Sequence, residues 1–417
     1  MTDVFTTKEN TKKTVSTLAR KRVLIVEDMS EMRQMLRSMM IALGYTNIEV
    51  EPSGQNALRQ VLDRHYDIIL SDFNLGGSVD GQQILEASRK SNTSDHSTIF
   101  IMITADTAYE SVVSVLEYQP DSYLVKPFTP AAFQRRFNRV KLQKKVFSDI
   151  NKNRKDSNYE AMENQAQAIE KQYPQYSSLC LKVIGESLFL RGAYKSAKKH
   201  YLKVIKNHHN LAWAYFGLAQ CELKLDHPLA AVDNLEKTIS LSRHFLSAYD
   251  ALADAHEELD NPEGAQAAMK DALEVSPRSI ERSKRLGQIS EKIKDWKTAE
   301  QAYSRIIRLT KETNQEKVEF YYDHLKCLTS MIQHQEHDIK NTEKIKRSLF
   351  RLRILGKDKP IVVTNSFRVE VQQHLYRDRL GDAIKSWKQW KHLIESGRAS
   401  PISNAQEITI KKKLGLL

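Results

Sequence analysis

The sequence has 417 residues and a formal net charge of +12, and its length suggests two or three domains. Its three cysteines, Cys180, Cys221 and Cys327, are far apart and form no CxxC pair, which argues against a disulfide framework or a zinc site. The longest apolar runs are too short to span a membrane, and the polar first residues lack the apolar core of a signal peptide. We therefore expect a soluble, cytoplasmic protein.

The positive charge is unevenly distributed along the chain. Residues 21–130 contain 9 Lys and Arg against 15 Asp and Glu, whereas residues 131–157 contain 9 against 2. Residues 158–313 are close to neutral, and residues 314–417 contain 20 basic against 12 acidic residues. The chain thus divides into an acidic N-terminal part, a basic connector, a neutral middle and a basic end.

Residues 1–20 are polar and without periodicity, so we expect a disordered tail. From residue 21 onward, short apolar runs alternate with helical patterns. The expected strands are residues 23–26, 48–50, 68–70, 98–103 and 122–125. The expected helices are residues 31–43, 54–65, 82–89, 108–116 and a fifth that begins at residue 130. This alternation predicts a doubly wound α/β domain with a five-stranded parallel sheet of the flavodoxin type over residues 21–140.

The fifth helix has no internal stop signal. Its apolar residues Phe133, Phe137 and Val140 are followed by Phe147 and Ile150 without an intervening glycine or proline. We therefore expect one long basic helix that leaves the first domain, with residues 141–157 as a helical linker. A linker whose basic face is merely solvated is the alternative.

Beyond residue 157 the strand patterns disappear and a period of 34 residues takes their place. Alanines recur at this period, each with a large residue four positions later and a glycine or alanine twelve positions earlier; they are Ala197, Ala231, Ala265 and Ala299. Two helices per unit explain the pattern, because small residues let paired helices approach and large residues fill the space between units. The pattern resembles tetratricopeptide repeats, which stack into an all-α solenoid with a concave face.

This resemblance defines the expected organisation of the second half of the chain. Four repeats are expected near residues 178–211, 212–245, 246–279 and 280–313, within a repeat domain over residues 158–313. Residues 314–417 keep a helical pattern but lose the register, so we expect a helical extension that caps the solenoid.

Charged and hydroxyl residues follow the ends of the expected strands. The first strand is followed by Glu27 and Asp28, and the third by Asp72. In the order 2-1-3-4-5 that is typical of this architecture, these strands are neighbours, so three carboxylates meet at one sheet edge. Oxygen-only ligands of this kind suit magnesium. The fourth and fifth strands add Thr104 and Lys126 at the same edge, a set that suits phosphoryl transfer to Asp72.

Residues 21–140 resemble the receiver domain of two-component response regulators. The matching residues are Glu27-Asp28, Asp72, Asp80-Gly81, Thr104-Ala105, Tyr123 and Lys126-Pro127-Phe128. The resemblance implies that Asp72 accepts a phosphoryl group from a phosphohistidine of a sensor kinase or phosphotransfer protein, with Lys126 and Thr104 as its catalytic neighbours.

The same resemblance implies a metal site and a switch. Magnesium would be held by Asp28, Asp72 and the main-chain carbonyl of Asn74, with Glu27 acting through water. Thr104 and Tyr123 would form the switch pair, and the Lys126–Pro127 bond would be cis. The loop after the acceptor departs from the family, because Gly76-Gly77-Ser78, with a one-residue insertion, stands where a proline is usual.

The first helices of the second and third repeats supply candidate contacts for a partner. These residues are Trp213, Phe216, Gln220, Asp250, Asp254 and Glu257. An apolar pair beside an acidic row suits a partner peptide with apolar and basic residues. Packing of Trp213 and Phe216 against the neighbouring half-repeat is the alternative.

We expect a response regulator, phosphorylated on Asp72, whose repeat domain binds a protein partner in a phosphorylation-dependent way. Beyond residue 140 there is no nucleophile–base pair or Gly-rich phosphate loop, so no separate enzymatic output is expected. The expected partners are the kinase or phosphotransfer protein, the ligand of the repeats and a second receiver in a homodimer, but neither membrane nor nucleic acid. Two alternatives remain: a nucleic-acid-binding regulator that uses the basic linker and C-terminal helices, and a phosphate sink that competes for a kinase.

Overall fold

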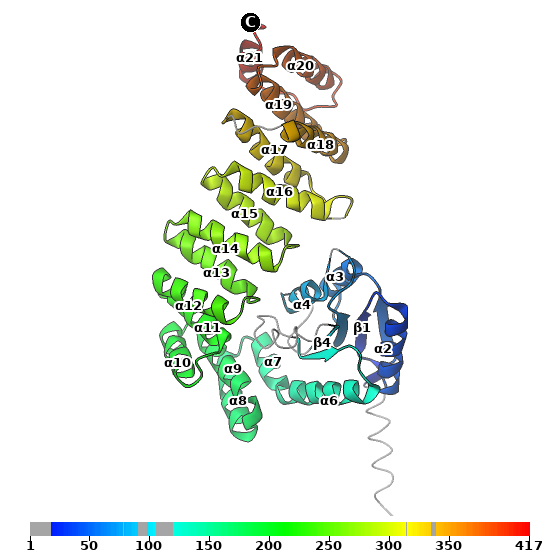
Figure 1. Cartoon of the computed structure of the whole chain (residues 1–417), viewed down its shortest axis with the longest axis vertical. Helices are drawn as coiled ribbons and strands as arrows, with labels where there is room; N and C mark the ends of the chain where they lie inside the picture. The colour runs from blue at the N-terminus through cyan, green and yellow to red at the C-terminus, as the bar shows by residue number, and fades with distance from the viewer. Residues whose placement is uncertain (1–17, 78, 91–97, 106–119, 314, 335–338) are drawn as a thin grey trace, which may run out of the picture. The chain divides into compact units, whose positions relative to one another are not determined.

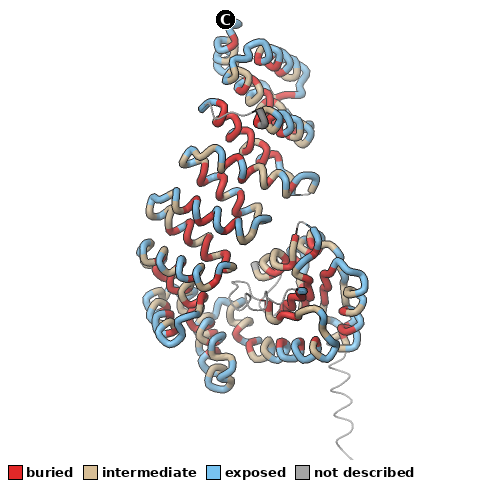
Figure 2. The backbone as a smooth tube through the Cα atoms, in the orientation of Figure 1, coloured by how far each residue is buried: buried red, intermediate tan, exposed pale blue. Residues whose placement is uncertain are grey.

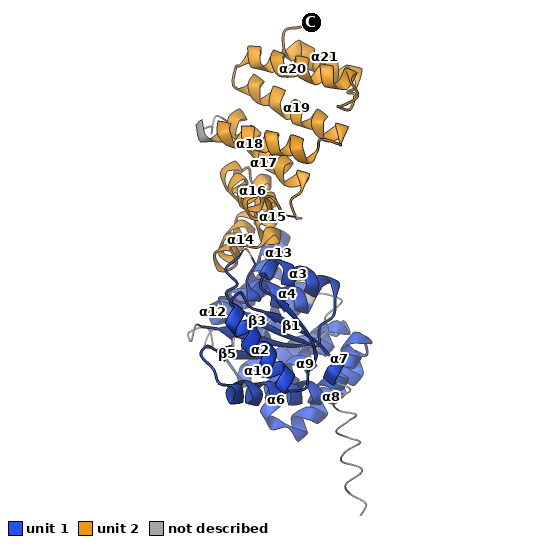
Figure 3. Cartoon of the chain, turned by 90° about the vertical axis from the view of Figure 1, so that its right-hand side faces the viewer, with its two compact units in different colours: residues 1–259 blue, residues 260–417 orange. Residues whose placement is uncertain are grey.

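The computed structural model describes residues 18–77, 79–90, 98–105, 120–313, 315–334 and 339–417. The chain forms two compact units, residues 1–259 and 260–417, and each is described by itself (Figure 3). The division falls between the two helices of the third expected repeat. The expected helix at residues 108–116 and most of the expected N-terminal tail lie outside the described residues.

A five-stranded parallel sheet forms the core of the N-terminal part. Its strands are β1 Arg22–Val26, β2 Asn47–Glu51, β3 Ile68–Asp72, β4 Ile99–Thr104 and β5 Ser122–Val125. They are arranged in the order β2-β1-β3-β4-β5, which confirms the prediction. Val26 of β1 lies opposite Ser71 of β3, so the next residues, Glu27 and Asp72, come level at the same end of neighbouring strands.

Described helices cover both faces of the sheet (Figure 1). They are α2 Ser30–Ala42, α3 Gly54–Asp63, α4 Gly81–Lys90 and α6 Pro130–Val146. Side chains of β1 alternate between two apolar clusters, because successive residues of a strand point to opposite faces. Val23 and Ile25 pack with α2 and α6, whereas Leu24 and Val26 pack with α3 and α4. This is the doubly wound fold that the strand and helix alternation predicts.

The helix that follows the sheet is interrupted. α6 ends at Val146, Phe147 adopts non-helical backbone angles, and α7 spans Ser148–Lys155. The prediction of one uninterrupted helix through Ile150 is therefore wrong. Phe147 and Ile150 are buried in a cluster with residues of α8 and α9, and the Phe147 ring lies 5.7 Å from the ring of Tyr176. This packing overrides a local sequence that contains no helix-breaking residue.

The rest of the chain is helical. In the first unit, α8 Tyr159–Gln172, α9 Ser177–Leu190, α10 Tyr194–Asn207, α11 Ala212–Lys224, α12 Pro228–Leu241 and α13 Leu246–Glu258 follow, with a 3-10 turn at Pro174–Tyr176. The second unit contains α14 Pro262–Val275, α15 Ile280–Lys292, α16 Trp296–Thr310, α17 Val318–Gln333, α18 Ile339–Leu355, α19 Pro360–Tyr376, α20 Leu380–Glu395 and α21 Asn404–Lys413. Buried and exposed residues alternate along these helices, as expected for stacked amphipathic hairpins (Figure 2).

The turn between the two helices of each repeat recurs every 34 residues. Its central residue has a positive φ at Gly192, Asp226, Asp260 and Lys294, with values of 75°, 64°, 51° and 60°. Glycine adopts this conformation without strain, whereas a side chain such as that of Lys294 does so at a cost. The turn conformation thus recurs with the same 34-residue period as the sequence pattern, although the type of residue at this position varies.

The small residues of the repeat allow large ones to pack between helices. A Cβ atom at Gly287 of α15 would lie 2.6 Å from Cζ of Tyr303 on α16, and one at Gly185 of α9 would lie 2.6 Å from the ring of Tyr201 on α10. Both tyrosines are buried. Glycine at these two positions therefore permits the close approach that the sequence pattern predicts.

A buried polar network joins α16, α17 and α18. Glu300 Oε1 accepts hydrogen bonds from Ser304 and Lys344, and it lies 2.9 Å from Nε2 of His324. Burial raises the pKa of Glu300, but these polar contacts outweigh it and lower the pKa to about 2. The carboxylate is thus held ionised within the helical core.

The three cysteines are buried, as expected for small apolar side chains. All four tryptophans of the sequence lie beyond residue 212. Two of them, Trp387 and Trp390 of α20, pack edge to face with ring centroids 5.4 Å apart in the C-terminal apolar cluster. In the part of the chain that the structure describes, no helix combines the length and apolar character needed to cross a membrane.

Candidate functional site

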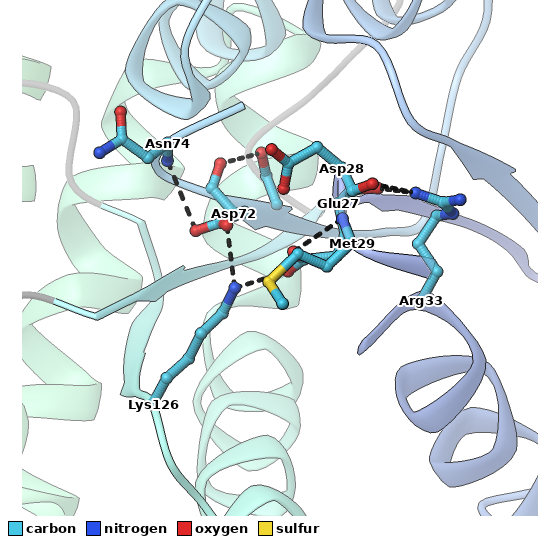
Figure 4. A network of polar contacts seen from close by, with 8 residues as sticks. Glu27, Asp28, Met29, Arg33, Asp72, Asn74 and Lys126 are labelled. Carbon is cyan, nitrogen blue, oxygen red and sulfur yellow. Dashed lines mark hydrogen bonds and ion pairs between the residues drawn. The ribbon is translucent and has the colours of Figure 1, made fainter. Parts of the chain in front are cut away.

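Three acidic side chains meet at the carboxyl ends of β1 and β3 (Figure 4). Glu27 and Asp28 directly follow β1, and Asp72 is the last residue of β3. One carboxylate oxygen of each lies within 4.8 Å of the others. Glu27 and Asp72 are buried, whereas Asp28 is exposed. The structure therefore brings together the three carboxylates that the strand order predicts.

Lys126, just after β5, reaches the same cluster. Its Nζ atom lies 2.8 Å from Oε2 of Glu27 and 2.9 Å from Oδ2 of Asp72. Burial lowers the pKa of Lys126, but its hydrogen bonds to Glu27 and Asp72 outweigh burial and raise the pKa above its ordinary value. Burial raises the pKa of Glu27, and this effect exceeds the lowering by Lys126. The ammonium group is thus firmly charged and bridges the two buried carboxyl groups.

Arg33 of α2 fixes the main chain beneath the acidic pair. Its Nη1 atom donates hydrogen bonds to the carbonyl oxygens of Glu27 and Asp28, each 2.7 Å long. Met29 at the N-terminus of α2 makes no side-chain cap, but its main-chain N–H donates to Oε1 of Glu27 over 3.4 Å, so Arg33 is one of two polar links between this helix and the end of β1. The sequence pattern carries no signal for this role, because a single arginine in an amphipathic helix is ordinary.

The loop after Asp72 is anchored on both sides of its glycines. Leu75 and Val79 are buried in the apolar cluster of α3 and α4, while Gly76 has a φ of 62°. Ser78, part of the insertion that departs from the family pattern, lies outside the described residues.

A Cβ atom at Gly81 would overlap the carbonyl oxygen of Asp72, which explains glycine at the start of α4. The main-chain N–H of Asn74 donates to Oδ1 of Asp72 over 3.4 Å.

The remaining receiver residues lie on the neighbouring strands. Thr104 ends β4 and is buried, and its carbonyl oxygen accepts the main-chain N–H of Lys126 at 2.7 Å. Tyr123 of β5 lies beside Met102 of β4 and is also buried. The Lys126–Pro127 bond is cis, as predicted. Thr104 is therefore placed at the carboxylate edge, one strand away from Asp72.

The donor set fits a hard divalent cation. Lys126 pairs with only two of the three carboxylates, so the cluster keeps an excess of negative charge. Oxygen atoms are the ligands that magnesium prefers, and a metal at this position would neutralise the excess. Glu27, Asp28 and Asp72 are the side chains that would hold it.

The candidate partner residues of the repeats lie on α11 and α13. Trp213 is half-buried, with its ring 6.4 Å from that of Tyr201, and the half-buried Phe216 ring lies 4.8 Å from that of Phe245. Both aromatic side chains thus pack between helices. The other four candidates are half-buried or exposed, namely Gln220, Asp250, Asp254 and Glu257. A partner-binding role for all six stays a prediction.

Comparison with known proteins identifies the N-terminal part. Residues 23–138 match the family model described as the response regulator receiver domain. The chemotaxis protein CheY-3 of Vibrio cholerae serotype O1 is 28% identical over 119 residues, which cover 28% of this chain and 90% of that protein. The chemotaxis protein CheY of Pseudomonas aeruginosa is 27% identical over 119 residues, covering 94% of its own length.

Solved structures resemble both parts of the chain. A tetratricopeptide repeat protein from Parabacteroides merdae matches 65% of this chain and 97% of its own, with 13% identity and a TM-score of 0.35. A receiver domain of the sensor histidine kinase PA1611 from Pseudomonas aeruginosa PAO1 matches 28% of this chain and 95% of its own, with 27% identity and a TM-score of 0.25. That structure has a magnesium ion coordinated in its active site cleft.

The family match, the strand order and the cluster around Asp72 agree with one another. The chain therefore carries at residues 23–138 the receiver domain of two-component response regulators, followed by an all-helical region similar to tetratricopeptide-repeat proteins.

Proposed function

We propose that this chain is a phosphorylatable response regulator, with Asp72 as the phosphoryl acceptor and the helical region as a protein-binding output. The observation that carries the proposal is the convergence of Lys126 and the acidic pair on one buried aspartate at the carboxyl edge of the sheet. Functional groups of open α/β folds collect at this edge. A phosphohistidine of a sensor kinase or phosphotransfer protein is the proposed donor.

Each neighbour of Asp72 has a task in this proposal. A carboxylate oxygen of Asp72 attacks the phosphorus atom, and the bond from phosphorus to the histidine nitrogen breaks as the new phosphorus–oxygen bond forms. Asp28, Asp72 and the Asn74 carbonyl, with Glu27 acting through water, would hold magnesium, which would supply positive charge for the phosphoryl oxygens. The Lys126 ammonium stands within hydrogen-bond reach of the acceptor and stabilises the same charge.

Thr104 and Tyr123 are the proposed switch. Both are buried, Thr104 on β4 next to the strand of Asp72 and Tyr123 on β5 beyond it, and Thr104 is joined through its carbonyl oxygen to the main chain of Lys126. A phosphoryl group that draws Lys126 and the Thr104 hydroxyl toward itself would bias the position of β4 and β5. We propose that this bias reaches the helical region, where it changes the binding of a protein partner.

The decisive experiment compares wild type with Asp72→Asn. The full chain is incubated with magnesium and a small phosphodonor such as acetyl phosphate, and acid-labile phosphate is measured. Asp63→Asn, an exposed aspartate at the end of α3, is the matched control. We expect phosphate incorporation in wild type and Asp63→Asn and none in Asp72→Asn.

Partner binding by the same proteins, measured with and without beryllofluoride, tests whether the helical region responds to modification of Asp72. A partner that is gained or lost only when Asp72 is modified would support a switched adaptor. Incorporation of phosphate with unchanged partners would instead favour a phosphate sink, and no incorporation in wild type would refute the role of Asp72 as a phosphoryl acceptor.

A further inference from the structure

A pocket of about 380 Å³ lies between α17 and α19 in the C-terminal unit. These two helices are packed side by side, although α18 separates them in sequence (Figure 1). The pocket lies outside the four expected repeats, in the region that the sequence pattern assigns only to capping. It is open to solvent rather than enclosed, so a ligand can reach it without unfolding the helices.

Two lining residues are held by hydrogen bonds within the helical stack. Nε2 of Gln373 donates to Oγ1 of Thr329 over 3.0 Å, and the Tyr322 hydroxyl donates to the carbonyl oxygen of Val362 over 3.1 Å. Nine of the ten lining residues carry a polar side-chain group, and Val369 is the exception. Apolar parts of these side chains nevertheless form most of the exposed lining, so the few charged groups decide which ligand fits.

Charged side chains of both signs line the pocket. Asp323 and Lys326 come from α17, and Arg368 comes from α19. Lys326 is engaged by Glu291 of α15. Neither Asp323 nor Arg368 has an ion-pair partner within contact distance among the described side chains. One half-buried carboxylate and one guanidinium group thus remain available to a ligand.

The surroundings of Asp323 make the ionised form of its side chain less favourable than in water. The side chain is half-buried, and burial raises its pKa, as does the negative charge of Glu291, while Lys284 and Lys326 lower it. A cationic group in the pocket would relieve this cost by pairing with the carboxylate. Asp323 would repel a simple anion, and Arg368 and Lys326 would repel a simple cation. A ligand that carries both charges avoids both penalties.

We propose that the pocket between α17 and α19 binds a dipolar ligand, whose cationic nitrogen pairs with Asp323 and whose carboxylate pairs with Arg368. Two sources share this chemistry: a free amino acid, and a peptide segment in which a basic side chain lies near an acidic one. A guanidinium group can donate two parallel hydrogen bonds to one carboxylate, so Arg368 fixes the orientation of the ligand. The C-terminal helices are then a binding site as well as a cap.

Isothermal titration calorimetry with the full chain tests the proposal. The free amino acid probes are arginine, lysine and glutamate. The peptide probes are acetylated and amidated tetrapeptides that contain one Lys and one Glu at each spacing, with Lys-only, Glu-only and uncharged tetrapeptides as controls. Asp323→Asn removes one charge with little change in shape, and Arg368→Gln removes the other charge and shortens the side chain. Asp358→Asn and Arg398→Gln, exposed residues of the same unit outside the lining, are the matched controls.

We expect a dipolar probe to bind more tightly than every single-sign probe, and each pocket variant to weaken it by about tenfold or more. The two control variants should bind as wild type does. Binding of a free amino acid would identify a small-molecule site, and binding of blocked peptides alone would identify a site for a protein segment. Equal affinity for dipolar and single-sign probes, unchanged binding by both pocket variants, or no binding of any dipolar probe would overturn the proposal.

Discussion

Replacing Gly287 by alanine tests whether the repeats depend on the contact between a glycine and a tyrosine. The added Cβ would lie 2.6, 2.8 and 3.0 Å from three ring carbons of Tyr303. Tyr303 is 2% exposed and belongs to an apolar cluster, so its ring has no free space to move into. Overpacking of this kind costs about 3 kcal/mol at the upper end of its usual range. The better helix propensity of alanine returns about 1 kcal/mol. We therefore expect a net loss of about 2 kcal/mol.

Gly381 provides the opposite case in the same unit. It lies in the first turn of α20, and no atom lies within 4 Å of where its Cβ would be. Gly381→Ala should therefore stabilise the chain by about 0.5 kcal/mol, because alanine restricts the unfolded chain without a clash. The two substitutions are chemically identical and are expected to have opposite signs.

Urea denaturation followed by far-ultraviolet circular dichroism measures both effects as shifts of the midpoint. The double variant Gly287→Ala with Tyr303→Leu should be more stable than the sum of its single variants predicts, since leucine vacates the space that the new methyl group needs. If Gly287→Ala were as stabilising as Gly381→Ala, the close approach of α15 to Tyr303 could not be a constraint on the fold, and this explanation of the 34-residue pattern would fail.

Three further predictions concern charged residues. Arg33→Gln should weaken magnesium binding by about tenfold, and Arg33→Lys by less, because only one nitrogen makes both hydrogen bonds; calorimetric titration with magnesium measures this. Lys126→Met leaves buried Glu27 and Asp72 without their cation, so the metal-free chain should lose about 3 kcal/mol. Magnesium at 100 times its Kd stabilises wild type by about 2.7 kcal/mol, and at the same concentration Lys126→Met should gain more, because it lacks the ammonium group that competes with the metal. In thermal melts the variant should therefore lose less stability with magnesium than without, and an equal loss in both conditions would contradict the reasoning. The folded-state pKa of Glu300, about 2, lies below the ordinary 4.5, so its contribution to stability is present above about pH 4.5 and is lost as the pH falls toward 2. Thermal midpoints from neutral to acidic pH should fall less steeply in Glu300→Gln than in wild type.

The receiver site was predictable because its residues lie at strand ends. Parallel strands present their carboxyl ends at one edge, so the strand order alone brings Glu27, Asp72 and Lys126 together. Gly81 was predicted only through the family resemblance, and the structure supplies the reason, because a Cβ atom there would overlap the main chain of Asp72. These features depend on short segments whose neighbours are fixed by the topology.

Other features depend on contacts that no local pattern records. The break at Phe147 is set by burial of that ring against Tyr176, and the sequence around it contains no glycine or proline. Arg33 acts through two main-chain carbonyl groups, which have no sequence signature. Asp323 and Arg368 line the same pocket only because α17 packs against α19, from which α18 separates it in sequence.

The placement of the tryptophans has an optical consequence. None of them lies in the receiver domain, and all four belong to the helices from α11 to α20. Intrinsic indole emission of the unlabelled chain therefore originates wholly in the helices from α11 to α20, and the carboxylate edge of the sheet contributes none. Excitation of indole observes those helices alone, so a change in emission that follows a chemical change at Asp72 would show that the helical part has responded to it.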